Sequence, residues 1–314
     1  MNEKVVVILG PTASGKSDLA VKLAKKFNGE IISADSRQVY KGLDIGSGKV
    51  PRDKKPPRNH KLEAKSYFHK GIPHHLLDVA NPKEIFTVKQ FKKLAQDKIK
   101  EIQKRGKLPI ICGGSGFYIQ AVVDNISLPE VEPNIQLRKN LEKKSTKELG
   151  KILKKLDARR FKTIDAKNPR RLIRAIEIAK ALGKVPKLKK NRTAKILQIG
   201  IEIFDTGLKT KIKGRLLLRI KKGMVKEVKN LHATGLSWKR LENLGLEYRY
   251  VALYLQGKIS KKEMIEKLKS EIWKYAKRQR TWFKKDKRIK WFNPKEAKKI
   301  EQTIRDFLSK KGPL

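Results

Sequence analysis

The chain has 314 residues, enough for one large or two modest domains around a sizeable core. Its 78 Lys and Arg outnumber 31 Asp and Glu, a formal net charge of +47, which indicates a polyanionic partner unless the excess is a lysine-rich bias spread over solvated faces. The single cysteine, Cys112, excludes a disulfide framework and no apolar run reaches membrane-spanning length, so we expect a cytoplasmic protein without a signal peptide or a membrane partner.

The first predicted elements are a strand over 4–9, a glycine-rich loop, and a helix that runs to about residue 27. Strand, loop and helix in this order are the setting of a phosphate-binding P-loop. Lys16 adds a positive charge, the Ser17 hydroxyl is the expected ligand of a Mg²⁺ cofactor, and the helix N-terminus favours an anion. The candidate diphosphate or nucleotide ligands are Gly10, Pro11, Thr12, Ala13, Ser14, Gly15, Lys16 and Ser17.

The second predicted strand, 30–34, is followed by an acidic residue, Asp35. The carboxyl ends of parallel strands share one crevice, so this carboxylate should lie beside the mouth of the P-loop. Asp35 can then serve as a general base or as a hydrogen-bond acceptor for the substrate that receives the transferred group. Alternatively, it only caps a helix that begins near Ser36.

After residue 42, a polar stretch rich in Pro and Lys predicts a long exposed loop up to about residue 73, with a short strand at 76–79. Apolar periodicity predicts a helix over 87–103 with Thr87 as its N-cap. The next strand, 108–112, ends in Gly113-Gly114-Ser115-Gly116 and lacks the Asp with which ATPases and GTPases hold Mg²⁺. The Ser115 hydroxyl could approach the same phosphates, although a plain tight turn explains these glycines equally well.

This alternation of strands and helices predicts an α/β fold of the P-loop NTPase type, with a doubly wound parallel sheet. From residue 124 the pattern becomes helical and strongly basic, which predicts an all-helical insertion over 124–189 between two segments of a catalytic core, 1–123 and 190–314. The core should resume with a strand at 196–204, helical patterns at 207–232 and 260–286, a strand at 288–292 and a helix over 294–310.

Two basic motifs suit an RNA partner. Asn168-Pro-Arg-Arg-Leu-Ile-Arg174 opens a helix with three arginines on roughly one face, although a solvated surface is the usual meaning of such a run. Residues 277–284 combine Lys and Arg with stackable rings, as surfaces that bind single-stranded nucleic acid do.

Taken in order along nearly the whole chain, these motifs resemble those of the tRNA dimethylallyltransferase (tRNA isopentenyltransferase) family. The resemblance implies transfer of a dimethylallyl group from dimethylallyl diphosphate to N6 of adenine 37 in the anticodon stem-loop of tRNA, by a protein that we expect to be a monomer. Besides the P-loop, the matching blocks are Asp35-Ser36-Arg37-Gln38-Val39-Tyr40, Asp44-Ile45-Gly46, Gly71-Ile72-Pro73-His74-His75-Leu76-Leu77-Asp78, Gly113-Gly114-Ser115-Gly116-Phe117-Tyr118, the motif that begins at Asn168, and Arg278-Gln279 with Thr281-Trp282-Phe283.

The resemblance also implies roles for single residues. Asp35 would accept or orient the N6 proton, Ser115 would donate to the bridging diphosphate oxygen, and Arg215 would contact the diphosphate. Ser115 stands where the family more often has Thr, which keeps the hydroxyl. The implied tRNA contacts are Asp35, Ser36, Arg37, Gln38, Arg170, Arg171, Leu172, Ile173, Arg174, Glu242, Asn243, Leu244, Gly245, Leu246, Glu247, Lys277, Arg278, Gln279, Arg280, Thr281, Trp282, Phe283 and Lys284.

Two other functions remain open from the sequence. A small-molecule kinase would consume ATP and need no RNA, and the basic helical insertion disfavours it. A nucleic-acid-binding protein with a vestigial P-loop would form no product, and the intact Lys16 and Ser17 disfavour it.

Overall fold

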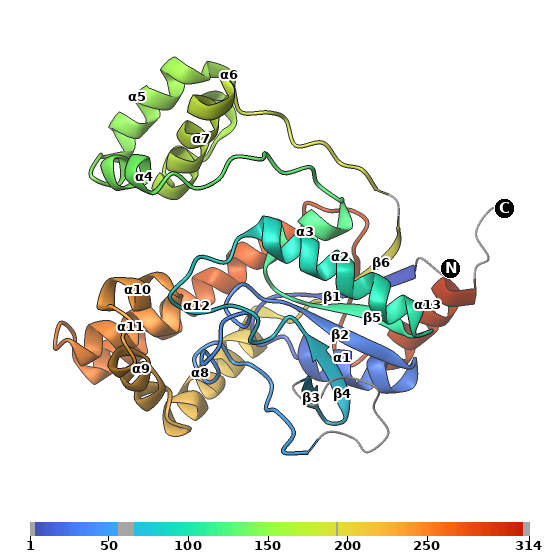
Figure 1. Ribbon diagram of the computed structural model, residues 1–314. Helices are drawn as coiled ribbons and strands as arrows, with labels where there is room; N and C mark the ends of the chain where they lie inside the picture. The colour runs from blue at the N-terminus through green and yellow to red at the C-terminus, as the bar shows by residue number, and fades with distance from the viewer. Residues whose placement is uncertain (1–3, 56–65, 193, 310–314) are drawn as a thin grey trace. The chain divides into compact units, whose positions relative to one another are not determined.

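The computed structural model describes residues 4–55, 66–192 and 194–309 (Figure 1). The chain forms two compact units. The core unit contains the residues before 124 and after 192, and the helical unit is Asp124–Arg192. The expected insertion, 124–189, ends three residues earlier than this helical unit.

The core unit is built on a seven-stranded sheet in the order β3-β4-β2-β5-β1-β6-β7. Neighbouring strands are parallel except for β3 and β4, which pair antiparallel. The predicted doubly wound parallel sheet is therefore confirmed, with an antiparallel edge hairpin added to it. The strands are β1 (Lys4–Leu9), β2 (Gly29–Ala34), β3 (Tyr67–His69), β4 (Ile72–His75), β5 (Leu108–Gly113), β6 (Lys195–Ile201) and β7 (Lys290–Phe292).

Helices cover both faces of the sheet because successive side chains of a strand point to opposite sides (Figure 1). On β1, Val5 and Val7 pack in a cluster with helices α2 (Val88–Lys104) and α3 (Gly116–Val123). Val6 and Ile8 pack instead with α1 (Lys16–Lys26) and α13 (Ala297–Ser309). Cys112 lies in this second cluster as a buried free thiol.

A lobe of five helices completes the core unit, with its own apolar core around Leu216, Tyr248 and Leu268. The helical pattern predicted over 207–232 is two helices, which are separated at Gly223, a residue with φ of 99°. The sequence analysis did not predict α10 and α11. The five helices are α8 (Asp205–Lys221), α9 (Met224–Ala233), α10 (Trp238–Asn243), α11 (Leu246–Leu255) and α12 (Lys261–Phe283).

The segment after residue 42 differs from the predicted exposed loop. Leu43 is fully buried, and the buried Lys49 ammonium donates to the Tyr40 carbonyl and to the carboxylates of Asp44 and Asp78. The predicted strand at 76–79 is also wrong. The strand in this part of the chain is β4, which ends at His75, and residues 76–78 bend instead of extending. Residues 56–65 of the predicted loop lie outside the described residues.

The helical unit packs its helices around Leu149, Leu153 and Leu172. The buried Glu177 accepts hydrogen bonds from Arg138 and Arg174 and so ties two of the helices together. The two connecting segments pair through an antiparallel bridge between Ile126 and Lys190, which is why this unit continues beyond residue 189. Its helices are α4 (Ile135–Glu142), α5 (Thr146–Leu156), α6 (Ala158–Thr163) and α7 (Pro169–Leu182).

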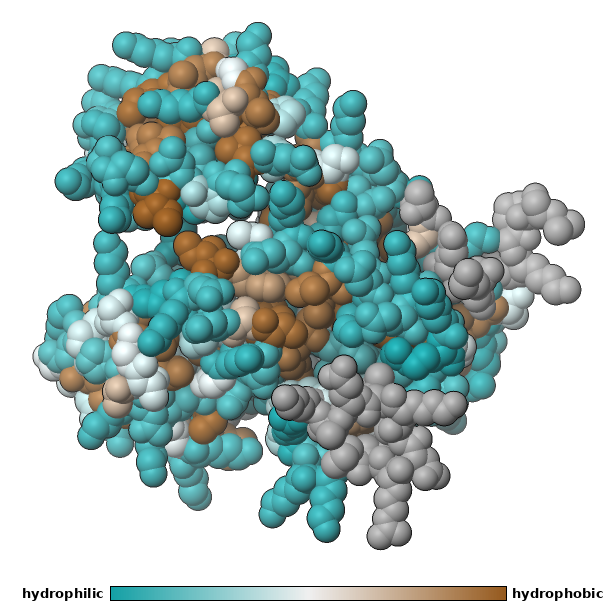
Figure 2. Space-filling model, in the orientation of Figure 1, coloured by the Kyte–Doolittle hydropathy of each residue, from teal (hydrophilic) through white to brown (hydrophobic). Residues whose placement is uncertain are grey.

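Hydrophilic side chains cover most of the face shown in Figure 2, as the large excess of Lys and Arg would lead one to expect. Within the described ranges, no helix combines the length and the apolar character that crossing a bilayer requires.

Candidate phosphate-binding and catalytic site

The predicted catalytic groups follow three adjacent strands. β5 lies between β1 and β2, and Gly113 at its carboxyl end is in register with both Leu9 and Ala34. The P-loop follows β1, Ser115 follows β5, and Asp35 follows β2. The three segments therefore meet at one edge of the sheet, where open parallel sheets bind their ligands.

The P-loop passes directly into α1. Gly15, the N-cap of that helix, has a φ of 85°, a left-handed conformation that glycine adopts at little cost. Lys16 folds back over the loop, and its Nζ donates to the Pro11 carbonyl at 3.1 Å. Desolvation lowers the pKa of Lys16, Arg215 lowers it further, and Asp35 acts in the opposite direction. The charges of Arg215 and Asp35 therefore both act on the P-loop lysine, in opposite directions.

Ser115 and Asp35 are held by backbone amides of the same short turn. The Ser36 N–H donates to Ser115 Oγ at 2.9 Å, so the hydroxyl oxygen accepts here and its own proton can be donated elsewhere. The Arg37 N–H donates to Asp35 Oδ1 at 2.8 Å. This bond makes a local Asx turn rather than the cap of a helix, since the residues that follow form turns.

The charge of Asp35 acts on two phenols. Burial raises the pKa of Tyr275 and of Tyr118, and the negative charge of Asp35 contributes to both increases. Sequence reasoning did not assign a function to either side chain. The available signals were the aromatic residues within the basic segment of α12 and the last position of the Gly113-to-Tyr118 block.

Arg215 lies on α8, and its Nη2 is 3.4 Å from the point that a Cβ on Gly48 would occupy. The neighbouring Arg219 donates to the Gly46 carbonyl at 2.8 Å and pairs with Glu247 at 3.0 Å. The two arginines of α8 are thus held against the backbone of the loop that precedes β3.

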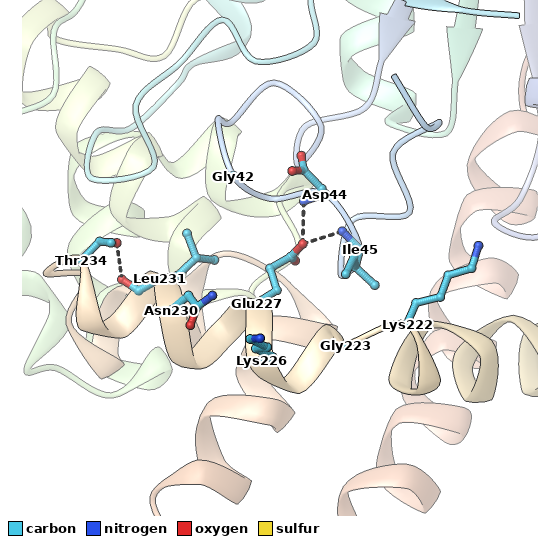
Figure 3. Close-up of a pocket in the computed structure, with 10 residues that line it drawn as sticks. All are labelled: Gly42, Asp44, Ile45, Lys222, Gly223, Lys226, Glu227, Asn230, Leu231 and Thr234. Carbon is cyan, nitrogen blue, oxygen red and sulfur yellow. Dashed lines mark hydrogen bonds between the residues drawn. The ribbon is translucent and has the colours of Figure 1, made fainter. Parts of the chain in front are cut away.

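Glu227 on α9 anchors this loop (Figure 3). Its carboxylate accepts from the N–H groups of Asp44, Ile45 and Gly46 at 2.6–3.1 Å, and from the Tyr248 hydroxyl at 2.9 Å. The first two of these bonds are drawn in Figure 3, in a pocket whose lining residues include none of the candidate catalytic groups. Sequence reasoning missed Glu227, because only the fold brings α9 to this loop.

The structure sorts the predicted tRNA contacts by burial. Arg170, Arg171, Lys277, Arg278, Thr281, Lys284 and Asn243 have exposed side chains, and Asp35, Ser36, Arg37, Gln38, Arg174, Glu242, Gly245, Leu246, Glu247, Arg280 and Trp282 are half-buried. Five predicted contacts have buried side chains and cannot meet a tRNA surface in this conformation: Leu172, Ile173, Leu244, Gln279 and Phe283. These buried residues are interspersed with exposed ones because one face of an amphipathic helix packs against the core and the other faces solvent.

The start of α1 offers a single hydroxyl, which suits a Mg²⁺ ion held jointly with substrate phosphates. The Ser17 side chain is exposed in the first turn of the helix. Among the described residues, no group of three or more His, Cys, Asp or Glu side chains could hold a metal ion. A single hydroxyl is the kind of protein ligand expected when substrate phosphates and waters complete the Mg²⁺ shell.

Comparisons with known proteins agree with these observations. The family model described as IPP transferase matches residues 38–286. The chain is 39% identical over 314 residues to the tRNA dimethylallyltransferase of Anoxybacillus flavithermus, covering 98% of this chain and 96% of that protein.

Two solved structures are similar over nearly the whole chain. The tRNA isopentenylpyrophosphate transferase of Bacillus halodurans has a TM-score of 0.70 and 34% identity, with 98% of this chain and 97% of that chain covered. A eukaryotic dimethylallyltransferase that acts on tRNA has a TM-score of 0.71 and 25% identity, with 96% and 77% covered. The extent of these matches shows that the chain belongs to the IPP transferase family.

Proposed function

We propose that the protein transfers a dimethylallyl group from dimethylallyl diphosphate to N6 of adenine 37 in the anticodon stem-loop of tRNA. In a member of this family, one observation supports the proposal most strongly: a phosphate loop, a carboxylate and a hydroxyl meet at the carboxyl ends of three adjacent strands. The central strand, β5, ends in glycine, so the site lacks the acid with which an NTPase holds Mg²⁺ at this position.

The donor half of the reaction depends on charge stabilisation. In the proposed mechanism the allylic C–O bond breaks and the leaving diphosphate gains negative charge. The P-loop amides, Lys16 and Arg215 would stabilise that charge, and Ser115 would donate a hydrogen bond to the bridging oxygen. Ser17 would hold Mg²⁺, which supplies further neutralisation of the diphosphate when bound.

The acceptor half depends on Asp35. A C–N bond forms between the allylic carbon and N6 of the adenine, and the N6 proton passes to the Asp35 carboxylate. The hydrogen bond from Arg37 fixes the orientation of that carboxylate. The adenine must leave its stack to reach the strand ends, at a cost of a few kcal/mol that contacts to the rest of the tRNA can offset.

The exposed basic residues of both units support a folded RNA as acceptor. Arg278 and Lys277 lie on the exposed part of α12, each near an aromatic ring: Arg278 is 6.0 Å from the Tyr275 centroid, and Lys277 is 5.6 Å from that of Trp273. Arg170 and Arg171 are exposed at the start of α7. Such side chains contact phosphates and stack on bases, and they fit a polyanion better than a small acceptor.

The test is incubation of the protein with dimethylallyl diphosphate, Mg²⁺ and unmodified tRNA, followed by mass analysis of the nucleosides. We expect one adenosine to gain a single five-carbon unit, and release of diphosphate in equal amount. A matched reaction with ATP in place of the prenyl donor should give no product. If the reaction with ATP gives a phosphorylated product and the reaction with dimethylallyl diphosphate leaves adenosine unmodified, the protein is a kinase and this proposal is wrong.

A further inference from the structure

Gln279 lies within the basic segment of α12, but its side chain is only 6% exposed. Its carboxamide bonds to the backbone of two other segments of the core unit. Oε1 accepts from the Thr12 N–H in the P-loop at 2.8 Å, and Nε2 donates to the Gly114 carbonyl, in the turn between β5 and α3, at 2.9 Å. One side chain thus joins three separate parts of the sequence.

The turn between β5 and α3 is shaped to receive α12. A Cβ on Gly114 would lie 2.3 Å from Gln279 Nε2 and 3.4 Å from the Gly10 carbonyl oxygen, so an alanine at this position could not coexist with the bridge. One turn further along α12, Trp282 packs on Gly116, where a Cβ would lie 2.4 Å from Cδ1 of the indole. The helix therefore contacts this turn at two places, on either side of Ser115.

We propose that Gln279 is a positioning residue that fixes the P-loop relative to Ser115, and that it does not contact tRNA. This inference rests on the proposed function, in which the P-loop binds the diphosphate and Ser115 meets its bridging oxygen. The Thr12 amide is directed at the carboxamide, which holds the loop in the conformation that places Lys16 over it. Without the bridge, the part-buried Thr12 N–H and the buried Gly114 carbonyl lose their partners, and the two phosphate-facing segments can shift apart.

The principal variant is Gln279→Met, which keeps the length of the side chain and removes both polar atoms. We expect affinity for inorganic diphosphate to fall, KM for dimethylallyl diphosphate to rise and kcat/KM to drop about tenfold or more, because a small misplacement of reacting groups is costly. The dissociation constant for tRNA and its salt dependence should equal those of the wild type. The matched control is Gln302→Met, since that amide bonds only locally, to Asp306 on the same helix, and should change none of these values.

Gly114→Ala tests the same bridge by another route. The added Cβ displaces the carboxamide of Gln279 from its place, while Gln279 itself stays in the sequence. We expect the kinetic pattern of Gln279→Met, and a double variant no worse than either single variant, since both remove one interaction. Gly207→Ala on α8 is the control, because its Cβ would make only an ordinary 3.6 Å contact with Ile203.

Three results would overturn the inference. Weaker tRNA binding with unchanged diphosphate affinity would make Gln279 a tRNA contact. A lower melting temperature with unchanged KM and kcat would make it a purely structural residue. Additive losses in the double variant would mean that Gly114 and Gln279 act separately. If the wild type fails to prenylate tRNA, the proposed function fails, whereas the comparison of diphosphate affinities still decides what Gln279 does for the P-loop.

Discussion

Glu30 on β2 offers a quantitative prediction about stability. Its side chain is fully buried, and its carboxylate accepts from Nε2 of His75 and Nη2 of Arg105, each at 2.7 Å, with the Lys107 ammonium at 3.2 Å. Burial alone would raise the pKa of this carboxyl, but the hydrogen bonds from His75 and Arg105 lower it to about 2 from a reference of 4.5. The native state therefore binds the Glu30 proton more weakly than the unfolded chain does.

This lowered pKa translates into a free energy. The lowering of the Glu30 pKa from 4.5 to about 2, at about 1.4 kcal/mol for each tenfold change in proton affinity, corresponds to about 3 kcal/mol of native-state stability. Because the folded pKa is lowered, the contribution is complete above the unfolded pKa near 4.5 and is lost as the pH falls toward about 2. Gln at this position does not titrate, so Glu30→Gln should cost about 3 kcal/mol at neutral pH, and the difference should narrow to about 2 kcal/mol at about pH 3.5.

The assay is urea unfolding of both proteins, followed by tryptophan fluorescence, at neutral pH and at several values down to about pH 3.5. Urea is preferred to guanidinium because it leaves the ion pairs unscreened. The control is Glu101→Gln, which removes an exposed partner of Lys98 on α2 and should cost less than about 1 kcal/mol. A Glu30→Gln difference that stays constant over this pH range would refute the linkage argument and assign the loss to packing.

Four further predictions concern the site. Asp35→Asn keeps an acceptor for the Arg37 N–H but removes the carboxylate that would act as the base. Turnover should therefore be abolished while tRNA affinity, measured by filter binding, persists, and wild-type-like turnover would show that Asp35 is not the base. Lys16→Ala should weaken inorganic diphosphate in calorimetry and raise KM for the prenyl donor, and unchanged values for both would contradict its assignment to the phosphates. Ser115→Ala should slow transfer far more than Ser115→Thr, which keeps the hydroxyl; equal rates in single-turnover assays would exclude hydrogen-bond donation. Arg278→Ala should weaken tRNA binding and reduce the salt slope by about one, whereas an unaltered slope indicates a merely solvated side chain.

The sheet and its phosphate loop could be predicted from the sequence because their signals are local. Five consecutive apolar residues before a glycine loop specify β1 and the P-loop, and Thr87 caps α2 with the capping box that its spacing to Gln90 allows. The meeting of Asp35 and Ser115 with that loop follows from the rule that parallel strands deliver their carboxyl ends to one edge.

Other features depend on distant packing and left no local signal. Helices α10 and α11 are short, and α11 is fixed by burial of Tyr248 against residues far along the chain. The late basic block is contiguous in sequence, but α12 turns Gln279 and Phe283, four residues apart, onto one buried face while Arg278 stays exposed. A motif marks the segment that matters, whereas the helical period decides which of its side chains reach the surface.

The buried thiol has a practical consequence. Cys112 is 7% exposed, and burial raises its pKa to about 11, so hardly any thiolate forms near neutral pH and reagents have little access to it. Maleimide dyes would therefore react with a cysteine introduced at an exposed position and leave the native one alone. Pairs of such labels, one in each compact unit, would allow fluorescence energy transfer to follow both units during turnover in the otherwise unaltered chain.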